Sequence, residues 1–435
     1  MKRFLQAILA MLASRIVRRY QPVVVGITGS VGKTSTKEAI FAVLKTKYRV
    51  RRSEKSFNTE FGLPLTILGA EYPGRNPLAW ARIFATGAWQ LVSRAPYPDI
   101  LILEFGVQEP GDMGYLLRIA TPHIGVVTTI GETPVHVAYF PNPAALAAEK
   151  AKLVAAVPPD GSVILNADDA VVRAMAAGTK AGVVLYGFGS EAKLRISQYD
   201  LRIRMSGDDF AIDGISFKLA FGESEVPIRL SRTVGRQQAY VAAAAAAVGM
   251  AFGMNLIEIV GALAAYEAPA GRLKFILAKK GAWLLDDTYN ASPVATLAAL
   301  DVLSDIPAKR KIVVLGDMRE LGRFTEPAHR TIGDAVAEVA DRFIGVGESM
   351  KVAIAAATRE PEGGERRLAR AMTYWFARPE QAVRELERML RPGDLVLIKG
   401  SQSIRMERVV EALMAEPAKA RELLARQTVD WKKRP

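Results

Sequence analysis

The sequence predicts an α/β protein built from two units, each with a mostly parallel sheet covered by helices. Buried-type apolar runs alternate with helical patterns from residue 21 to about residue 168, and the same alternation resumes after residue 268. Between them, residues 183–233 alternate apolar and polar side chains, which predicts a small antiparallel sheet. The length of 435 residues is also too great for one ordinary domain.

The first twenty residues predict an amphipathic helix. Their basic residues have no acidic counterpart, and apolar residues recur at helical spacing at Leu5, Ile8, Leu12 and Ile16. The apolar run 4–13 is too short to span a bilayer. Arginines, and no small-residue cleavage site, follow it. We expect this helix to pack on the next domain, or to make a peripheral contact with an anionic membrane.

The segment 26–36, GITGSVGKTST, has the layout of a phosphate-binding loop. It follows a β-branched run and precedes a helical pattern, so backbone N–H groups and a helix N-terminus can surround phosphate oxygens. Lys33 can reach the β- and γ-phosphates, and the Thr34 hydroxyl can ligate Mg²⁺. The strict Gly-x4-Gly-Lys-Thr pattern is not met, because Ile27 stands five positions before Gly32. A glycine-rich turn with a chance Lys-Thr is the alternative interpretation.

A buried-type strand at 99–104 ends at Glu104. A carboxylate at the carboxyl edge of a sheet, beside a phosphate loop, is placed to hold Mg²⁺, and a surface ion pair is the alternative. Around it, strands are predicted at 48–52, 124–129 and 162–168, and helices at 78–94, 112–120, 143–157 and 238–253.

The pattern breaks at 269–272 and a second α/β alternation begins. Strands are predicted at 282–287, 311–315, 342–346 and 394–398, and helices at 293–304, 327–340, 379–390 and 404–415. The expected organisation is an N-terminal helix, a central domain, a C-terminal Rossmann-like domain and a basic tail, at 1–20, 21–267, 268–418 and 419–435.

Composition excludes several kinds of site. Without cysteine the chain has neither disulfides nor a thiolate zinc site, which suits a cytoplasmic protein. Its three histidines are too scattered for a histidine-based metal motif. The net charge of +13 lies partly at the two ends, and no nucleic-acid-binding module is recognisable. From the charge we expect small anionic substrates or an anionic membrane surface, and no nucleic-acid partner. We also expect a monomer.

Six motifs occur in a fixed order along residues 26–407. They are GITGSVGKTSTKE at 26–38, NTEFGLPLT at 58–66, LEFG at 103–106, DDTYNASP at 286–293, LGDMRELG at 315–322 with His329, and KGS at 399–401 with Met406-Glu407. Over about residues 21–415 the chain resembles the Mur ligases, and within them the members that add D-alanyl-D-alanine. The resemblance implies a central P-loop ATPase domain followed by a Rossmann-like ligase domain.

The resemblance further implies an ATP-dependent amide ligase of cell-wall precursor synthesis. ATP would phosphorylate the carboxylate of a muramoyl-peptide-like substrate, and a dipeptide amine would attack the acyl phosphate. Lys33 and Mg²⁺ would neutralise the charge on the transferring phosphoryl group. The alternatives are a family ligase for another carboxylate and amine, or a phosphate-loop NTPase without ligase activity.

The resemblance also assigns residues to roles. Gly29, Ser30, Gly32 and Ser35 would join Lys33 and Thr34 around ATP. Thr34 and Glu104 would hold one Mg²⁺, while His136 and a carbamylated Lys150 would place a second. Without the resemblance, Lys150 would be interpreted as a solvated helix lysine. Lys152, two residues later, is the alternative candidate for the carbamylated lysine.

In the second domain, Arg272 matches a family arginine that meets the ATP phosphates, and Asp287 matches a carboxylate on the ribose. Asn290 and His329 match positions near the nucleotide and acceptor, although packing or capping is an equal alternative for both.

The chain departs from the family pattern in three places. Gln237 and Val241 stand where the family has His and Asn, so the adenine contacts must differ. Ala138 replaces a glutamate two residues after His136. Only about twenty residues precede the phosphate loop, too few for the family's UDP-binding domain. We expect a carboxylate substrate that is held differently, is lipid-linked or truncated, or is not a UDP-sugar.

Overall fold

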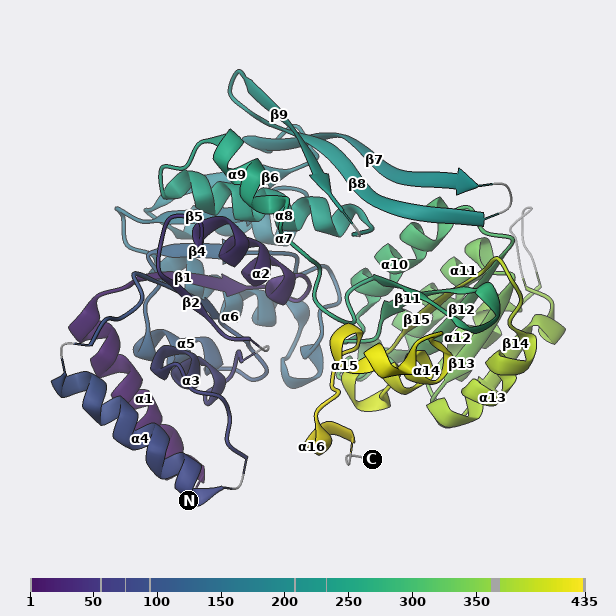
Figure 1. Ribbon diagram of the computed structural model, residues 1–435, viewed down its shortest axis with the longest axis horizontal. Coiled ribbons are helices and arrows are strands. Elements are labelled where there is room, and N and C mark those ends of the chain that lie inside the picture. The colour runs from purple at the N-terminus through teal and green to yellow at the C-terminus, as the bar shows by residue number, and fades with distance from the viewer. Residues whose placement is uncertain are drawn as a thin grey trace.

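The computed structural model describes residues 2–54, 57–74, 76–93, 95–206, 209–231, 233–360 and 368–432. Figure 1 shows two sheets side by side, each with helices on both faces. We call the nine-stranded sheet with its packed helices the large-sheet unit, and the six-stranded sheet with its packed helices the small-sheet unit. The predicted mixed α/β class is confirmed. The last residues of the predicted basic tail, 433–435, lie outside the described residues.

The large sheet has nine strands in the order β2-β3-β1-β4-β5-β6-β7-β8-β9. Neighbours from β2 to β7 run parallel. Their bounds are β1 Val23–Thr28, β2 Val50–Arg52, β3 Ile100–Glu104, β4 Ile124–Val127, β5 Ser162–Asn166 and β6 Gly182–Gly187. Continuous apolar runs suit these strands because helices bury both faces.

Different helices cover the two faces of the large sheet. Helices α2 (Lys33–Leu44), α8 (Arg236–Ala251) and α9 (Leu256–Leu263) share one apolar core with it. On the other face, α5 (Asp112–Ile119) joins the core that includes α1, and α6 (Pro143–Ala156) and α7 (Ala170–Arg173) pack on β4 and β5. The phosphate loop, at the start of α2, thus lies at the carboxyl edge of the sheet.

The predicted antiparallel strands exist, but they extend the large sheet and form no small sheet of their own. They are β7 Leu194–Ser206, β8 Asp209–Phe221 and β9 Ser224–Leu230. Strand β7 pairs in parallel with β6, which joins the antiparallel meander to the parallel strands. An alternating pattern identifies a strand and its buried face but does not specify its neighbour, so this connection could not be predicted.

Helix α1 (Lys2–Tyr20) packs on the large-sheet unit against α3 (Gly62–Leu68) and α4 (Pro77–Val92). Leu9, Ala13 and Ile16 are fully buried in the core that α1 shares with these helices. The packing interpretation of the N-terminal helix therefore accounts for its apolar stripe. Across the ranges the structure describes, no helix combines the length and apolar character needed to cross a membrane.

The small sheet has six strands in the order β10-β11-β15-β12-β13-β14, and only β10 is antiparallel to its neighbour. The strands are β10 Lys274–Leu277, β11 Trp283–Asp287, β12 Arg310–Gly316, β13 Arg342–Val346, β14 Thr373–Phe376 and β15 Asp394–Lys399. The two edge strands, β10 and β14, have four residues each and were not predicted.

Helices α10 (Pro293–Asp305), α11 (Thr325–Val339) and α12 (Met350–Ala357) cover one face of the small sheet. Helices α13 (Pro379–Met389), α14 (Glu407–Leu413) and α15 (Ala420–Leu423) cover the other, and α16 is Val429–Lys432. The helix predicted at 404–415 begins later, at Glu407, because Arg405 adopts a left-handed φ of 65° that interrupts the helix.

Candidate active site

The phosphate loop has the backbone that its glycines permit. Gly29 and Gly32 have φ of 139° and 90°, and a Cβ on Gly29 would lie 2.0 Å from Thr128 Oγ1. Ser30 N and Val31 N donate to Thr129 O on the neighbouring strand end, at 2.7 and 3.0 Å. The loop is therefore held by the sheet, with α2 beginning at Lys33.

Lys33 folds over this loop, where its Nζ donates to Gly29 O at 2.7 Å. Desolvation lowers the pKa of Lys33 to about 8, the Glu104 carboxylate opposes that effect, and Arg272 adds to it. An anionic phosphate in reach of Nζ would restore the charged form, so the site favours a polyphosphate ligand.

Thr34 and Glu104 meet as predicted from their positions. Thr34 Oγ1 donates to Glu104 Oε2 at 3.3 Å, and Lys37 Nζ lies 3.3 Å from Glu104 Oε1. Glu104 is buried at the end of β3, and its Oε1 accepts no hydrogen bond from any described residue. A buried carboxylate and a hydroxyl are hard oxygen ligands, so the pair fits a Mg²⁺ that arrives with nucleotide phosphates. No group of three or more His, Cys, Asp or Glu among the described residues forms a dedicated metal cluster.

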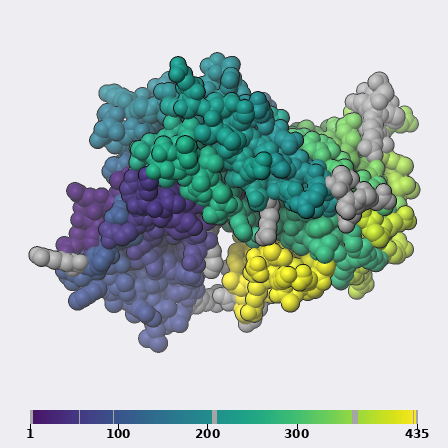
Figure 2. Space-filling view, turned by 45° about the horizontal axis from the view of Figure 1, so that its top comes forward, coloured from purple at the N-terminus to yellow at the C-terminus, as the bar shows by residue number. Residues whose placement is uncertain are grey.

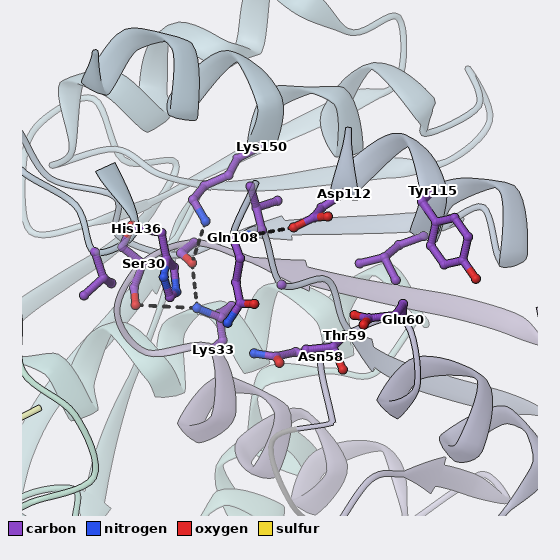
Figure 3. A pocket seen from close by; sticks show the side chains of 15 residues that line it. Ser30, Lys33, Asn58, Thr59, Glu60, Gln108, Asp112, Tyr115, His136 and Lys150 are labelled. Carbon is purple, nitrogen blue, oxygen red and sulfur yellow. Dashed lines mark hydrogen bonds between the residues drawn. The ribbon is translucent and has the colours of Figure 1, made fainter. Parts of the chain in front are cut away.

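Lys150, and not Lys152, reaches the phosphate loop (Figure 3). Its Nζ donates to Gly29 O at 3.2 Å, and its side chain is buried. Lys152 is half exposed and pairs with Glu149 at 2.6 Å. Burial, together with the neighbouring Lys33, holds the pKa of Lys150 well below its ordinary value. The structure thus favours a neutral amine here, which is the form that reacts with carbon dioxide.

His136 lines the same pocket as Lys150 (Figure 3), and it also contacts the small-sheet unit. Its Nδ1 is 2.5 Å from Oε2 of Glu320, and hydrogen bonding to this ring lowers the pKa of Glu320. The backbone supports the same contact, since Ala138 N donates to Glu320 O at 3.2 Å. Glu320 was not among the predicted site residues, although it lies inside the motif at 315–322.

Further residues that sequence reasoning missed line this pocket. They are Asn58, Thr59, Glu60, Gln108, Asp112 and Tyr115, and Figure 3 shows Gln108 beside Lys33. Asn58, Thr59 and Glu60 come from the loop before α3, Gln108 from the loop after β3, and Asp112 and Tyr115 from the first turns of α5. The motif at 58–66 was a signal for the first three, whereas no pattern identified Asp112 or Tyr115.

Arg272 reaches the phosphate loop from the small-sheet unit. A cavity of about 160 Å³ between the units is lined by Arg272 and Asn290 together with Ser30, Gly32, Lys33 and Thr34. The Arg272 guanidinium lies 4.2 Å from the ring centroid of Tyr289. The two predicted halves of the nucleotide site therefore face one another.

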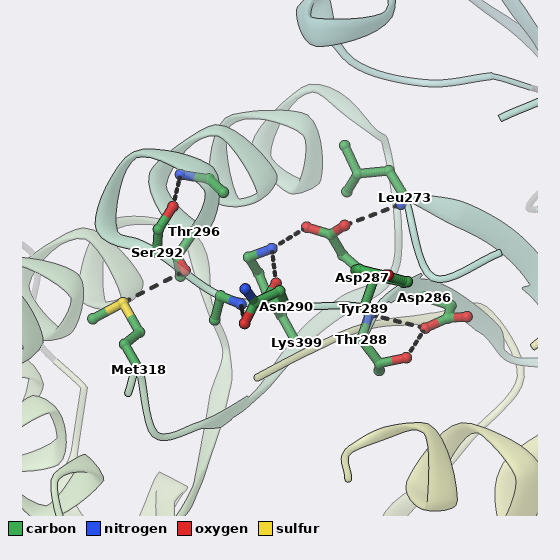
Figure 4. A network of polar contacts seen from close by, with 12 residues as sticks. Leu273, Asp286, Asp287, Thr288, Tyr289, Asn290, Ser292, Thr296, Met318 and Lys399 are labelled. Carbon is green, nitrogen blue, oxygen red and sulfur yellow. Dashed lines mark hydrogen bonds and ion pairs between the residues drawn. The ribbon is translucent and has the colours of Figure 1, made fainter. Parts of the chain in front are cut away.

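Asp287 forms a buried ion pair with Lys399 (Figure 4). Its Oδ2 pairs with Lys399 Nζ, and its Oδ1 accepts from Leu273 N at 3.3 Å. Lys399 also donates to Asn290 O at 2.9 Å, so one lysine fixes both predicted nucleotide-side residues. Asp287 lines a small cavity with Ser35, Gln237 and Val241, and its role at a ribose stays a prediction.

His329 supports the packing alternative. It is fully buried, and its Nε2 accepts from Met318 N at 3.1 Å while its Nδ1 lies 2.7 Å from Thr325 O. Both ring nitrogens thus contact backbone groups, one in the motif at 315–322 and one at the start of α11.

Asp286, next to this ion pair, gives a prediction on stability. Burial raises the pKa of Asp286 to about 6, so the folded chain binds more protons than the unfolded chain between about pH 4 and 6. Wild-type stability from this group therefore falls as pH rises through that window. Asp286→Asn keeps an acceptor for Thr288 and cannot ionise. In urea unfolding, the free energy of unfolding of the variant minus that of wild type should increase by about 3 kcal/mol between pH 4 and pH 8.

The matched control is Asp99→Asn. Arg49 holds the pKa of the exposed Asp99 below its ordinary value. The Asp99→Asn variant should therefore lose stability relative to wild type as pH rises. A difference between Asp286→Asn and wild type that stays constant with pH would refute the buried neutral carboxyl.

Comparison with known proteins places these features in one family. The Mur ligase middle domain matches residues 85–249, and the Mur ligase, glutamate ligase domain matches residues 271–402. The UDP-N-acetylmuramoyl-tripeptide–D-alanyl-D-alanine ligase of Mycobacterium tuberculosis is 32% identical, over 90% of this chain and 73% of that protein. The enzyme of the same name from Synechocystis is 29% identical, over 92% of this chain and 76% of that protein.

Solved structures match the chain to the same family. The MurF ligase of Thermotoga maritima, solved in complex with ADP, superposes with a TM-score of 0.74 at 25% identity. The match covers 95% of this chain and 84% of that one. Together with the relatives, it shows that this chain belongs to the Mur ligase family of ATP-dependent C–N ligases.

Proposed function

We propose that the chain is an ATP-dependent ligase that adds D-alanyl-D-alanine to the carboxylate of a muramoyl tripeptide, as the names of its relatives describe for them. The observation that supports this most is the meeting of Lys33, Glu104 and Lys150 with Arg272 at one inter-unit cleft. An arginine carried in by a second unit also serves NTPases, so the dependence of phosphate release on both substrates is what separates a ligase from an NTPase.

The proposed reaction follows from what each side chain can hold. The N–H groups at the start of α2, which have no acceptor within the helix, and the Lys33 ammonium bind the β- and γ-phosphates. A substrate carboxylate oxygen attacks the γ-phosphorus, a new O–P bond forms, and ADP leaves. The amine then attacks the acyl carbonyl, phosphate leaves with the O–P bond, and the amine loses a proton. Arg272 balances phosphoryl charge from the other side.

Thr34 and Glu104 are the proposed holders of one Mg²⁺, which supplies further charge neutralisation when bound. His136 and a carbamylated Lys150 are proposed for a second. Carbamylation joins the neutral Lys150 amine to carbon dioxide with loss of a proton, and the product is an anion beside the Lys33 cation. Burial and the lowered pKa of Lys150 support this assignment.

The nucleotide's sugar and base are assigned to the opposite end of the cleft. Asp287 and Asn290 are proposed near the ribose, and Ser35 near the phosphates. Gln237 and Val241 line the cavity beyond them, and the Gln237 Oε1 is buried without a hydrogen-bond partner among the described residues. That oxygen is available to an adenine amino group.

The setting of the enzyme is part of the same proposal. It works in the cytoplasm as a monomer, with small-molecule and peptide substrates and no nucleic-acid partner. The exposed arginines at the end of α1, Arg15, Arg18 and Arg19, give it a peripheral electrostatic contact with anionic membrane lipids.

The test is phosphate release by the purified chain with Mg-ATP. D-alanyl-D-alanine and a UDP-muramoyl tripeptide are supplied singly and together. The proposal expects release that needs both substrates and yields the corresponding amide. Release with neither indicates an NTPase, and no release at all refutes this substrate pair and directs the search to other carboxylates, beginning with membrane-borne ones.

A further inference from the structure

The C-terminal segment 420–432 returns to the cleft between the two units. Ala420 and Leu424 are buried in the core of the small-sheet unit, so the segment is anchored before it reaches the site. Figures 1 and 2 show it, in yellow, on the side of the small-sheet unit that faces the large-sheet unit. The family model that matches this unit ends at residue 402, so it assigns this segment no role.

Arg426 clamps the turn that carries Tyr289. Its guanidinium is almost fully buried and donates to Thr288 O at 3.1 Å and to Tyr289 O. Its charge is balanced by Glu407 at 3.2 Å. The guanidinium also lies 5.0 Å from the Tyr289 ring centroid, while Arg272 lies 4.2 Å from the same ring. Arg426 thus fixes the side chain on which the phosphate-facing Arg272 rests.

Trp431 continues from this clamp into a cavity. Its ring lies 5.8 Å from the Arg426 guanidinium and 5.6 Å from that of Arg405. Arg405 is itself fixed by Glu407 at 2.6 Å. The indole therefore rests against two arginines that a single buried carboxylate holds in place. These contacts hold the Trp431 ring in a defined position at the edge of the cavity.

The cavity that Trp431 lines measures about 570 Å³ and adjoins the phosphate cleft. It shares His136, Asn290 and Gln402 with the cavity that contains Lys33 and Arg272. A molecule bound there would thus lie next to the transferring phosphoryl group.

The lining of this cavity has mixed chemistry. Arg319 is more than half exposed and lies 3.4 Å from Asp317, whereas Arg405 is buried against Glu407. Glu320 lies beside the His136 ring, and Val135 and Trp431 are apolar. A short peptide with a free amine, a free carboxylate and small apolar side chains fits this lining. Its carboxylate would face Arg319 and its amine the Glu320 carboxylate.

We propose that Trp431 is a wall of the amine-substrate site and that Arg426 is the positioning residue that ties this wall to the Tyr289–Arg272 stack. The inference rests on the proposed ligase function. It assigns to the C-terminal segment a part in holding a short, zwitterionic peptide, with the segment's arginine linking that site to the ATP phosphates.

Steady-state kinetics test the wall. In Trp431→Ala, the KM for D-alanyl-D-alanine should rise at least about tenfold, with kcat and the KM for ATP within about twofold of wild type. Trp431→Phe should recover most of the loss, because a ring still fills the wall. The matched control, Trp89→Phe, changes an exposed tryptophan on α4 outside the cavity. An unchanged dipeptide KM in Trp431→Ala overturns the proposal.

The clamp is tested with Arg426→Lys, which keeps the charge opposite Glu407 but lacks the planar guanidinium that spans both carbonyls and the Tyr289 ring. Here the KM for ATP should rise and kcat should fall, each at least about tenfold, since the Tyr289–Arg272 stack loses its support. A variant that loses only thermal stability while both kinetic constants stay at wild-type values shows a purely structural role, which contradicts the assignment.

Intrinsic fluorescence gives a second readout that does not need turnover. Titrating the dipeptide onto the protein with a non-hydrolysable ATP analogue should change the emission of wild type and Trp89→Phe, but not of Trp431→Phe. If wild type ligates but the change persists in Trp431→Phe or never occurs, the inference fails and the function stands. If wild type neither ligates nor binds the dipeptide, the proposed function fails and the inference with it.

Discussion

Replacing Lys33 by alanine is expected to lower the rate of ATP-dependent phosphate release at least about 1,000-fold. Lys33 is the cation at the first turn of α2 and lies over the loop that would hold the phosphates. No other described lysine takes the same place, because Lys37 is engaged by Ser53 and Glu104, and burial lowers the pKa of Lys150, whose Nζ donates to Gly29 O. The charge that develops on the phosphoryl group would therefore lose its nearest partner.

The measurement is phosphate release at saturating Mg-ATP, dipeptide and carboxylate substrate. The control is Lys45→Ala, which removes an exposed lysine just beyond the end of the same helix. Its rate should stay within about twofold of wild type, since surface substitutions away from the site rarely matter. A Lys33→Ala enzyme of near-normal rate would rule out the phosphate-loop mechanism.

Lys150→Ala is expected to lose at least about 100-fold in rate and to recover much of it when a short-chain carboxylic acid is added. The substitution empties a buried position beside the loop, and acetate or propionate can place there the carboxylate that a carbamate would supply. The neighbouring Lys33 cation favours an anion at this point. Phosphate release against acid concentration measures the rescue.

Lys152→Ala is the matched variant, two residues along the same helix. Its side chain is half exposed and paired with Glu149, so near-normal activity without any response to carboxylic acids is expected. Rescue of Lys152→Ala in place of Lys150→Ala would reverse the assignment. Failure of every acid to rescue Lys150→Ala would show that the lysine acts as an amine.

Local sequence was enough to predict the phosphate loop and its metal side. An apolar strand, two glycines with positive φ and a Lys-Thr pair at a helix start are all consecutive in the chain. Glu104 could be placed because parallel strands bring their carboxyl ends to one edge, and β1 and β3 are indeed neighbours. For these elements, short-range pattern and sheet geometry carry the information.

The parts that could not be predicted depend on contacts between distant residues. Lys399 pairs with Asp287 across 112 positions, and Glu320 meets His136 from the other sheet unit. Arg426 reaches Thr288 across 138 positions. No local periodicity specifies such pairs. Asp287 and Lys399 meet because β11 and β15 are neighbours in the small sheet, and Arg426 returns to the turn that follows β11. Only the pair of Glu320 and His136 depends on how the two units pack together. Likewise, the alternation in β7 and β8 predicts strands but not their attachment to β6.

The central claim is that this chain activates a carboxylate as an acyl phosphate. The most direct test uses a muramoyl tripeptide whose reacting carboxylate is labelled with ¹⁸O, together with Mg-ATP and D-alanyl-D-alanine. Mass spectrometry of the products should find one carboxylate ¹⁸O in the released phosphate and the other in the new amide. Amide formed alongside unlabelled phosphate would contradict an acyl-phosphate route.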